Sequence, residues 1–426
     1  MTKKIAVIGS GFAGMAVACK LAKAGCDVTV YEKNNTAGGR AREFTAEGFT
    51  FDMGPSWYWM PDVFESFFNV FGKSVSDYYT LERLDPSYRV VFSKNEQMDI
   101  PAELSGVYQL FERLEPGSSE KLKAFLDEAA YKYDVGINDL VYKPGQSLSE
   151  LVDFRLMKGV FKLHVFQSIA KYIRKYFKDD RIIQLLEFPV LFLGAMPSKT
   201  PALYSLMNYA DIALGTWYPK GGMNQIVQGM QALAESLGVK FKFDAEVDQI
   251  KVNGNSAEGI VINETTYQAD YIVAGADYNH VEQNLLPAKY RKYSKEYWDS
   301  REMAPSSLIF YLGVNKKVNN ILHHNLFFDQ PFEQHAREIY EDPQWPSNPL
   351  FYVSATSKTD PNSAPEGMEN VFILIPVAPG LADDDKTREK YYELVMNRLE
   401  ELTGEKIKDH VIFKRSYAHN DFIKDY

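Results

Sequence analysis

Apolar positions near the start of the chain follow two different periods in close succession. Residues 5–8 (IAVI) form a continuous apolar run, as expected for a parallel strand that is buried on both faces. Apolar residues then recur at helical spacing over 13–22, and Gly25 stands where a glycine commonly ends a helix. Residues 28–31 (VTVY) predict a second strand, which ends at Glu32. The chain therefore opens with a predicted strand–helix–strand unit.

The turn inside this unit has the GxGxxG spacing of a dinucleotide-binding site. Gly9 permits a tight turn, Gly11 lets the backbone approach a pyrophosphate, and Gly14 lets the helix pack on the strand. The helix N-terminus attracts the phosphate charge, and Glu32 is placed to accept hydrogen bonds from a ribose diol. An export signal is the competing interpretation of the same apolar stretch. The predicted nucleotide contacts here are Gly9, Ser10, Gly11, Phe12, Ala13, Gly14, Glu32 and Lys33.

Strand patterns return after the middle of the chain. Alternation of apolar and polar residues predicts a strand from Val239 to Phe243 that continues through residues 245–248. Ile260 and Ile262 lie on another predicted strand. Residues 269–277 (ADYIVAGAD) predict a buried strand that returns to the nucleotide sheet, although the segment alone fits any buried strand that ends in a turn.

Composition and charge narrow the class of protein. The 426 residues carry 47 Lys and Arg against 57 Asp and Glu, a formal charge of −10, and 45% are hydrophobic. The chain is thus a globular protein, and its acidity argues against nucleic-acid binding. Two cysteines, Cys19 and Cys26, exclude a disulfide framework and favour a cytoplasmic setting. The 14% of aromatic residues fit either a large apolar cavity or a well-packed core.

Two further glycine-rich segments follow the first unit. Gly38, Gly39 and Arg40 complete the pattern ExxxxxGGR, which can bring backbone amides and a fixed cation to the same pyrophosphate or form an ordinary surface turn. Residues 51–56 read FDMGPS, another segment suited to close backbone approach.

The order GxGxxG, E(x5)GGR and FDxGPS is similar to that of the flavoproteins that include amine oxidases, protoporphyrinogen oxidase and carotenoid desaturases. The resemblance implies that the cofactor is FAD and that Val247 contacts its adenine side through the backbone. The further cofactor contacts that it implies are Gly38, Gly39, Arg40, Gly54, Pro55, Ser56, Val247 and Asp277.

A narrower resemblance covers essentially the whole chain. Four segments look like those of bacterial-type phytoene desaturases: residues 49–65, 186–211, 216–230 and 357–380. The implied reaction is FAD-dependent desaturation of phytoene, a long apolar polyene precursor, by hydride transfer to flavin and proton loss from the adjacent carbon. The alternatives are a desaturase of a later, hydroxylated carotenoid, a flavin amine oxidase, and a flavin-free prenyl-binding protein on the same scaffold. The GGR segment opposes the last of these.

The expected architecture is α/β, with a discontinuous Rossmann-like FAD-binding domain and an inserted substrate domain of mixed sheet and helices. The FAD domain is assigned to residues 1–84 and 216–290, and 85–215 to a helical, aromatic substrate region. Residues 291–426 are expected to add substrate-domain strands and helices. Family members close the FAD site with a C-terminal glycine-rich segment, so we expect this sequence, which stops before one, to be shortened.

The substrate side offers candidates but no assigned catalytic residue. Aromatic and apolar side chains could line a polyene tunnel, or could simply fill the core. They are Trp57, Tyr58, Trp59, Met60, Phe188, Phe192, Tyr204 and Trp217. The turn at residues 219–222 suits either flavin contact or a domain hinge. The adjacent His323 and His324 do not have metal-ligand spacing, so we expect no metal site.

One basic tract stands out in this acidic chain. Residues 155–181 carry eight Lys and Arg against Asp179 and Asp180, interleaved with apolar residues. Such a stretch can contact an anionic lipid surface, or it can be an ordinary helix with a solvated basic face. No apolar run approaches the roughly 18 residues that a spanning helix needs. Peripheral membrane association is therefore the most that the sequence predicts, and nothing in it defines the oligomeric state.

Overall fold

The computed structural model describes residues 2–143, 147, 163–191 and 194–426. Its first layer is a parallel sheet of order β13-β1-β2-β9. The strand–helix–strand prediction is confirmed, as β1 (Lys4–Ile8), α1 (Phe12–Lys23) and β2 (Asp27–Tyr31) follow in that order. The outer strands are β9 (Lys240–Lys242) and β13 (Tyr271–Ala274), from much later in the sequence.

The apolar run of β1 is buried on both faces, as its pattern predicts. Ile5 and Val7 face a core formed with α1 and α9 (Asn224–Ser236). Ala6 and Ile8 face a second core, shared with an antiparallel three-stranded sheet. The strands of that sheet are β10 (Gln249–Asn253), β11 (Ser256–Ile262) and β12 (Thr265–Gln268).

Two strand predictions need correction. The strand expected to run through residues 245–248 ends at Lys242, because the backbone turns at Asp244, whose φ is 50°. The segment 269–277 does return to the nucleotide sheet, where β13 pairs parallel to β1. It is not buried, however, since β13 is the edge strand and Tyr271 is 58% exposed.

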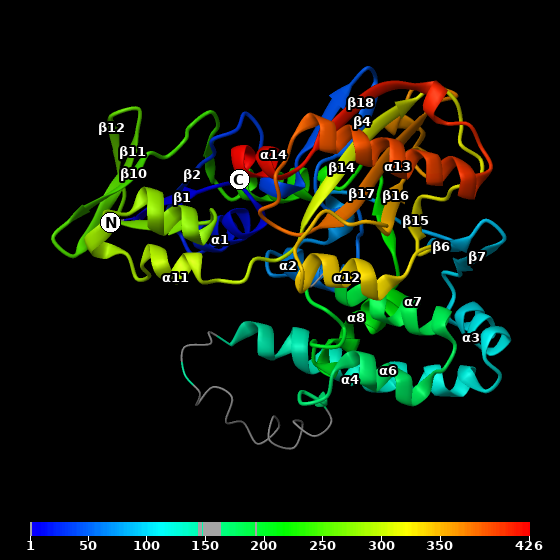
Figure 1. Ribbon diagram of the computed structural model, residues 1–426. Helices are drawn as coiled ribbons and strands as arrows, with labels where there is room; N and C mark the ends of the chain where they lie inside the picture. The colour runs from blue at the N-terminus through cyan, green and yellow to red at the C-terminus, as the bar shows by residue number, and fades with distance from the viewer. Residues whose placement is uncertain (1, 144–146, 148–162, 192–193) are drawn as a thin grey trace.

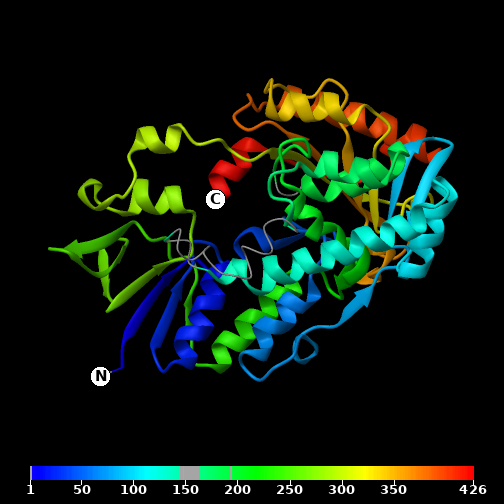
Figure 2. The same ribbon diagram turned by 90° about the horizontal axis from the view of Figure 1, so that it is seen from below.

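A seven-stranded sheet lies beside the nucleotide layer, and the C-terminal helix α14 (His419–Asp425) lies between the two (Figure 2). Its strands pair antiparallel, except that β15 and β6 are parallel. In spatial order they are β18 (Val411–Tyr417), β14 (Ser306–Val314), β17 (Glu369–Val377), β16 (Phe351–Ser354), β15 (His324–Phe327), β6 (Tyr88–Ser93) and β7 (Glu96–Ile100). Strands β6 and β7 come from the segment 85–215, which was expected to be helical and instead begins with this hairpin.

The two faces of this sheet have different partners. Leu308, Phe310 and Leu312 of β14 pack with α13 (Asp385–Thr403). The intervening Ile309 and Tyr311 join the largest core, which includes the helices that Figure 1 shows on the side away from α13. These helices are α3 (Leu104–Leu114), α4 (Ser118–Asn138), α6 (Ile169–Tyr176) and α7 (Asp180–Leu191).

Short elements join the two layers. The paired strands are β3 (Glu43–Ala46) with β4 (Phe49–Asp52) and β5 (Leu81–Arg83) with β8 (Trp217–Pro219). The remaining α-helices among the described residues are α2 (Pro61–Asn69), α8 (Leu206–Asn208), α10 (Tyr278–His280), α11 (Lys295–Asp299) and α12 (Phe332–Tyr340). Residues 209–214 and 281–285 form π-helical turns, η6 and η7. No helix in the part of the chain that the structure describes is long and apolar enough to cross a bilayer.

Candidate cofactor and substrate site

The turn between β1 and α1 requires glycine at two positions, at Gly9 for its backbone conformation and at Gly14 for lack of space. Gly9 has φ +90°, and its N–H donates to the Tyr31 carbonyl at 2.8 Å. A Cβ on Gly14 would stand 2.1 Å from the Gly9 carbonyl oxygen. Gly11 begins α1, and a Cβ there would have nothing within 4 Å, so its open side is free for a ligand. This is the shape that a pyrophosphate at a helix N-terminus requires.

Glu32 lies beside this turn and is only 4% exposed. One carboxylate oxygen accepts from the Ser10 N–H at 2.9 Å and the Ser10 hydroxyl at 2.7 Å. The other accepts from the backbone and side chain of Asn34, at 3.0 and 2.8 Å. Because four protein donors already satisfy the carboxylate, a ribose hydroxyl that binds here must replace one of them. Lys33 is exposed.

The second and third motifs assemble on the first. The Gly38 N–H donates to the Ser10 carbonyl at 3.0 Å. A Cβ on Gly39 would approach the Gly11 Cα to 3.3 Å, and one on Gly54 would stand 1.9 Å from the Arg40 carbonyl oxygen. The structure thus brings together three glycine-rich segments that the sequence places up to 45 residues apart.

Arg42, which was not among the predicted residues, holds the glycine-rich segments together. Its guanidinium donates to the Gly39 carbonyl at 3.2 Å and to the Asn34 side chain at 3.1 Å. It also forms an ion pair with Asp425 at 2.9 Å. Arg42 was not predicted from the sequence. Its position two residues after the GGR motif was the feature that could have identified it.

Val247, predicted at the adenine side, and Asp277, predicted as a further cofactor contact, follow two different strands of the nucleotide sheet. The Ala245 N–H donates to the Glu32 carbonyl at 2.9 Å, which brings the segment of Val247 next to β2. The Gly275 N–H donates to the Ile8 carbonyl at 2.8 Å, which places the end of β13 beside the glycine turn. Asp277 itself caps α10, since its carboxylate accepts from the His280 N–H at 3.1 Å.

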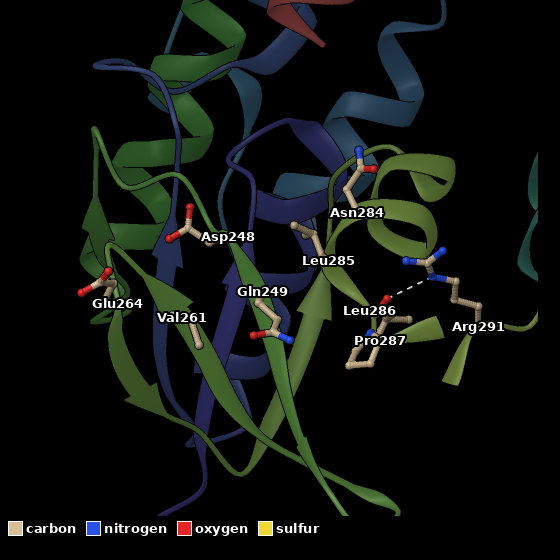
Figure 3. Close-up of a pocket in the computed structure, with 9 residues that line it drawn as sticks. All are labelled: Asp248, Gln249, Val261, Glu264, Asn284, Leu285, Leu286, Pro287 and Arg291. Atoms are coloured by element: carbon tan, nitrogen blue, oxygen red, sulfur yellow. Dashed lines mark hydrogen bonds between the residues drawn. The ribbon is translucent and has the colours of Figure 1, made fainter. Parts of the chain in front are cut away.

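An open hollow lies next to Val247. It is formed by β10, β11 and the turn that follows η7 (Figure 3). The Arg291 side chain closes one end and donates to the Leu286 carbonyl at 3.0 Å. The lining residues are Asp248, Gln249, Val261, Glu264, Asn284, Leu285, Leu286, Pro287 and Arg291. It lies outside the three glycine motifs, and none of the predicted cofactor contacts lines it.

An FAD fits the residues around these motifs. The close approaches at Gly14 and Gly54 leave no space for a Cβ, and Gly11 presents bare backbone at a helix N-terminus. A buried carboxylate stands at the end of β2, where a ribose would lie. Within the described ranges, no cluster of three or more His, Cys, Asp or Glu is arranged to hold a metal ion.

A wall of aromatic side chains begins directly after Ser56. The Trp57 ring lies 5.3 Å from Trp59, 5.2 Å from Tyr88 and 5.7 Å from Phe188, measured between centroids. These four residues, from the FDMGPS loop, β6 and α7, form what we call the aromatic wall. The sequence marked Trp57, Trp59 and Phe188 as candidates, whereas Tyr88 was missed.

The other predicted lining residues lie elsewhere. Tyr58 points to the opposite side of the loop, where its ring stacks on Phe64 and its hydroxyl bonds Tyr79 at 3.0 Å. Trp217 packs at the edge of that same nucleotide-domain core. Tyr204 is 36% exposed, and Met60 packs at the rim of the largest core. Phe192 lies outside the described residues.

Two adjacent histidines, His323 just before β15 and His324 at its first position, adjoin the wall. The His324 ring stacks on Trp57 at 4.2 Å, and its Nδ1 lies 2.6 Å from the Tyr352 hydroxyl. His323 Nδ1 bonds the Thr359 hydroxyl at 2.7 Å. Burial lowers the pKa of His323 to about 3 and that of His324 well below its usual value, so both imidazoles are neutral. They were considered from the sequence only as metal ligands.

The turn at residues 219–222 is fixed from both sides. Gly222 has φ +95°, and a Cβ there would lie 3.2 Å from the Asp52 carboxylate. The Gly221 N–H donates to Asp360 at 2.8 Å. Burial raises the pKa of Asp52 to about 7, although the backbone N–H groups of Met223 and Asn224 favour its charged form. A small hollow beside it is lined by Phe51, Asp52, Ser56, Ser354, Thr356, Asn370 and Phe372.

Comparison with known proteins agrees with this geometry. The model of the flavin-containing amine oxidoreductase family matches residues 12–424. A carotenoid 3,4-desaturase from Haloarcula japonica is 38% identical over 423 residues, which cover 99% of this chain and 86% of the relative. A zeta-carotene-forming phytoene desaturase from Myxococcus xanthus is 32% identical, over 92% of this chain and 76% of the relative. A crystal structure of an oxidoreductase from Methanosarcina mazei shares the fold, with a TM-score of 0.64 at 17% identity, over 97% of this chain and 88% of that one.

Proposed function

The chain belongs to the flavin-containing amine oxidoreductases, and among them to the bacterial-type carotenoid desaturases, and on that premise we propose that it desaturates a C40 carotenoid. Membership makes it an FAD-dependent oxidoreductase. The greater identity to the 3,4-desaturase than to the phytoene desaturase favours a later carotenoid over phytoene as substrate. Phytoene, which the sequence motifs first suggested, remains the second candidate.

The observation that carries the proposal is the continuity between cofactor loop and aromatic wall. Gly54 lies against Arg40, and Trp57 follows three residues later. A group held by that loop would therefore meet a surface of indole, phenol and phenyl rings, which suits a polyene and excludes water.

Each part of the chain has a proposed role around the cofactor. The glycine turn at residues 9–14, Glu32, residues 38–40, residues 54–56 and Asp277 would hold FAD, with Val247 at its adenine side. When bound, FAD supplies the oxidant that takes up a hydride from the substrate. The nucleotide layer and the large sheet with its helices then correspond to a cofactor part and a substrate part. The aromatic wall belongs to the core of the large sheet and its helices, with Trp57 packed against that core.

The test is direct. The purified full chain should show a flavin absorption spectrum, and in liposomes it should change the colour of an added carotenoid. Phytoene and a carotenoid that still has a saturated 3,4 bond are supplied separately. Conversion of the second alone supports the later step, and conversion of phytoene supports the earlier one. A folded protein with bound flavin that changes neither would refute the proposed function.

We also propose that the helical side contacts a lipid surface. Three apolar side chains stand exposed around α4 and α6, Val141 at 64%, Tyr142 at 70% and Phe166 at 94%. Part of the basic tract, residues 155–162, lies outside the described residues. Arg174 in the described part is bound to the buried Glu187, so it contributes little charge to a membrane face.

Liposome sedimentation tests this contact. We expect the triple change Val141→Ser, Tyr142→Ser and Phe166→Ser to lower binding to liposomes that contain anionic lipid, because burial of apolar side chains drives interfacial binding. Lys171→Glu, on the exposed side of α6, should lower it further at low salt. A triple variant that sediments like the unmodified protein would contradict a membrane role for this face.

A further inference from the structure

One buried carboxylate next to the aromatic wall has an oxygen without a partner. Asp211 is 3% exposed and lies in the π-helical turn η6 (Tyr209–Leu214), an uncommon element that is frequent at functional sites. Its Oδ2 accepts from the Tyr88 hydroxyl at 2.6 Å. Its Oδ1 is fully buried and has no hydrogen-bond partner. Because buried polar atoms are nearly always satisfied, such an oxygen calls for an explanation.

The neighbours of Asp211 tie it to the proposed reaction site. Tyr88, its hydrogen-bond donor, is itself a member of the wall, with its ring 5.2 Å from Trp57. Thr216 also faces the carboxylate, and the Thr216 hydroxyl accepts from the Trp59 indole N–H at 2.9 Å. Asp211 is therefore bonded to one member of the wall, Tyr88, and is close to a residue, Thr216, that is bonded to a second member, Trp59.

The other ionisable groups around η6 have partners of their own. Arg83 of β5 donates to the Thr216 and Ala102 carbonyls at 3.2 and 2.9 Å. Its positive charge also interacts electrostatically with Asp211. Glu103 and Asp85 face Arg83. On α4, which packs against the same segment, Lys132 bonds the Ser205 hydroxyl and Tyr133 bonds Asp62.

Desaturation requires a group that accepts a proton. The rings of the wall cannot do so near neutral pH, whereas a carboxylate with a vacant oxygen can. Burial raises the pKa of Asp211 to about 7, while the Tyr88 hydrogen bond, the Arg83 charge and the Thr216 hydroxyl oppose that rise. A base with its pKa near the working pH is well matched to proton transfer.

We propose that Asp211 is the catalytic base of the desaturation and that its Oδ1 accepts the proton lost by the substrate. This inference rests on the proposed function. The C–H bond next to the site of hydride loss breaks, its electron pair becomes the second bond of the new C=C, and the proton moves to Oδ1. The hydride lost from the neighbouring carbon reduces the bound FAD, so atoms and electrons balance.

Two variants of the full-length, flavin-loaded protein test the proposal by anaerobic single turnover with the carotenoid that the unmodified protein converts. Asp211→Asn should slow flavin reduction by about 100-fold or more, the usual contribution of a general base. The flavin content should stay unchanged, and so should carotenoid binding, which is measured by tryptophan fluorescence. Asp127→Asn, an exposed change on α4, is the matched control and should have no effect.

The variant Tyr88→Phe allows a second measurement, the pH dependence of the rate, which would not change if Asp211 had only a structural role. Loss of its hydrogen bond raises the pKa of Asp211, and a base acts only when ionised. The acid limb of the pH–rate profile should therefore shift to higher pH. An unmoved acid limb, or flavin reduction by Asp211→Asn within threefold of the control, would overturn the assignment. Should Asp211→Asn fail to hold flavin, the Tyr88→Phe profile decides alone. If the unmodified protein reduces no flavin with any carotenoid, the proposed function itself falls, and this inference with it.

Discussion

A Cβ on Gly54 would stand 1.9 Å from the carbonyl oxygen of Arg40, a distance that no real side chain tolerates. The two residues belong to different motifs, GGR and FDMGPS, and their main chains are in direct contact. Because the loop of Gly54 leads at once into Trp57, this contact fixes the aromatic wall relative to the cofactor loops.

Gly54→Ala is expected to damage both folding and cofactor binding. The new methyl group must push the Arg40 loop away, which should lower the free energy of unfolding by about 1–3 kcal/mol, as for other overpacked sites. Flavin affinity should fall as well. Gly11→Ala is the informative partner, since nothing lies within 4 Å of its Cβ. We expect it to leave the apoprotein's stability in urea unchanged while weakening flavin binding. Equal stability of both variants would contradict the close contact.

Glu32→Ala should destabilise the apoprotein. It leaves the buried Ser10 N–H without its acceptor, and an unsatisfied buried group costs about 1–3 kcal/mol. Urea unfolding of the flavin-free protein measures this cost directly. Lys33→Ala, an exposed change next to it, is the control and should stay within about 0.5 kcal/mol of the unmodified protein. A stable Glu32→Ala apoprotein would mean that Glu32 serves only the ligand.

The two buried histidines predict a loss of stability in acid. Burial holds the pKa of His323 at about 3 and that of His324 well below its usual value, so the unfolded chain binds more protons below about pH 6.5. The free energy of unfolding should therefore fall as pH drops, by about 2 kcal/mol per histidine from pH 6.5 to 5. The variant with His323→Gln and His324→Gln should show a flatter profile in urea titrations. An unchanged slope would show that these imidazoles take up protons in the folded state.

Lys132→Met should stabilise the protein at neutral pH. Lys132 is fully buried, its Nζ donates to the Ser205 hydroxyl at 3.0 Å, and burial lowers its pKa to about 8. Between pH 8 and the pKa that Lys132 has in the unfolded chain, the unfolded chain binds more protons than the folded one. The free energy of unfolding should therefore rise with pH by up to about 3 kcal/mol. The methionine variant should lack that rise. Urea unfolding at pH 7 and pH 10 distinguishes the unmodified protein from the methionine variant. The same change in the free energy of unfolding for both proteins would count against a buried ammonium.

The sequence determined the parts whose requirements are local. The apolar run of residues 5–8, the helix after it and Glu32 at the next strand end are decided by spacing and by glycine geometry, and the structure places them as predicted. The order of three glycine motifs sufficed to identify the family. Aromatic residues next to those motifs marked Trp57 and Trp59 as candidates for the substrate side.

Only the tertiary structure decided what depends on contacts between distant segments. It turned Tyr58 away from its neighbours, added Tyr88 to the wall through a hairpin in the segment expected to be helical, and showed that Ser10 and Asn34 already satisfy Glu32. It also placed Asp211 against Tyr88 of the wall, with one carboxylate oxygen that has no hydrogen-bond partner. Periodicity reports which face of an element is apolar, but not which element will cover that face. The partner of a buried polar atom is chosen by packing over the whole chain, and for Asp211 only the folded molecule reveals it.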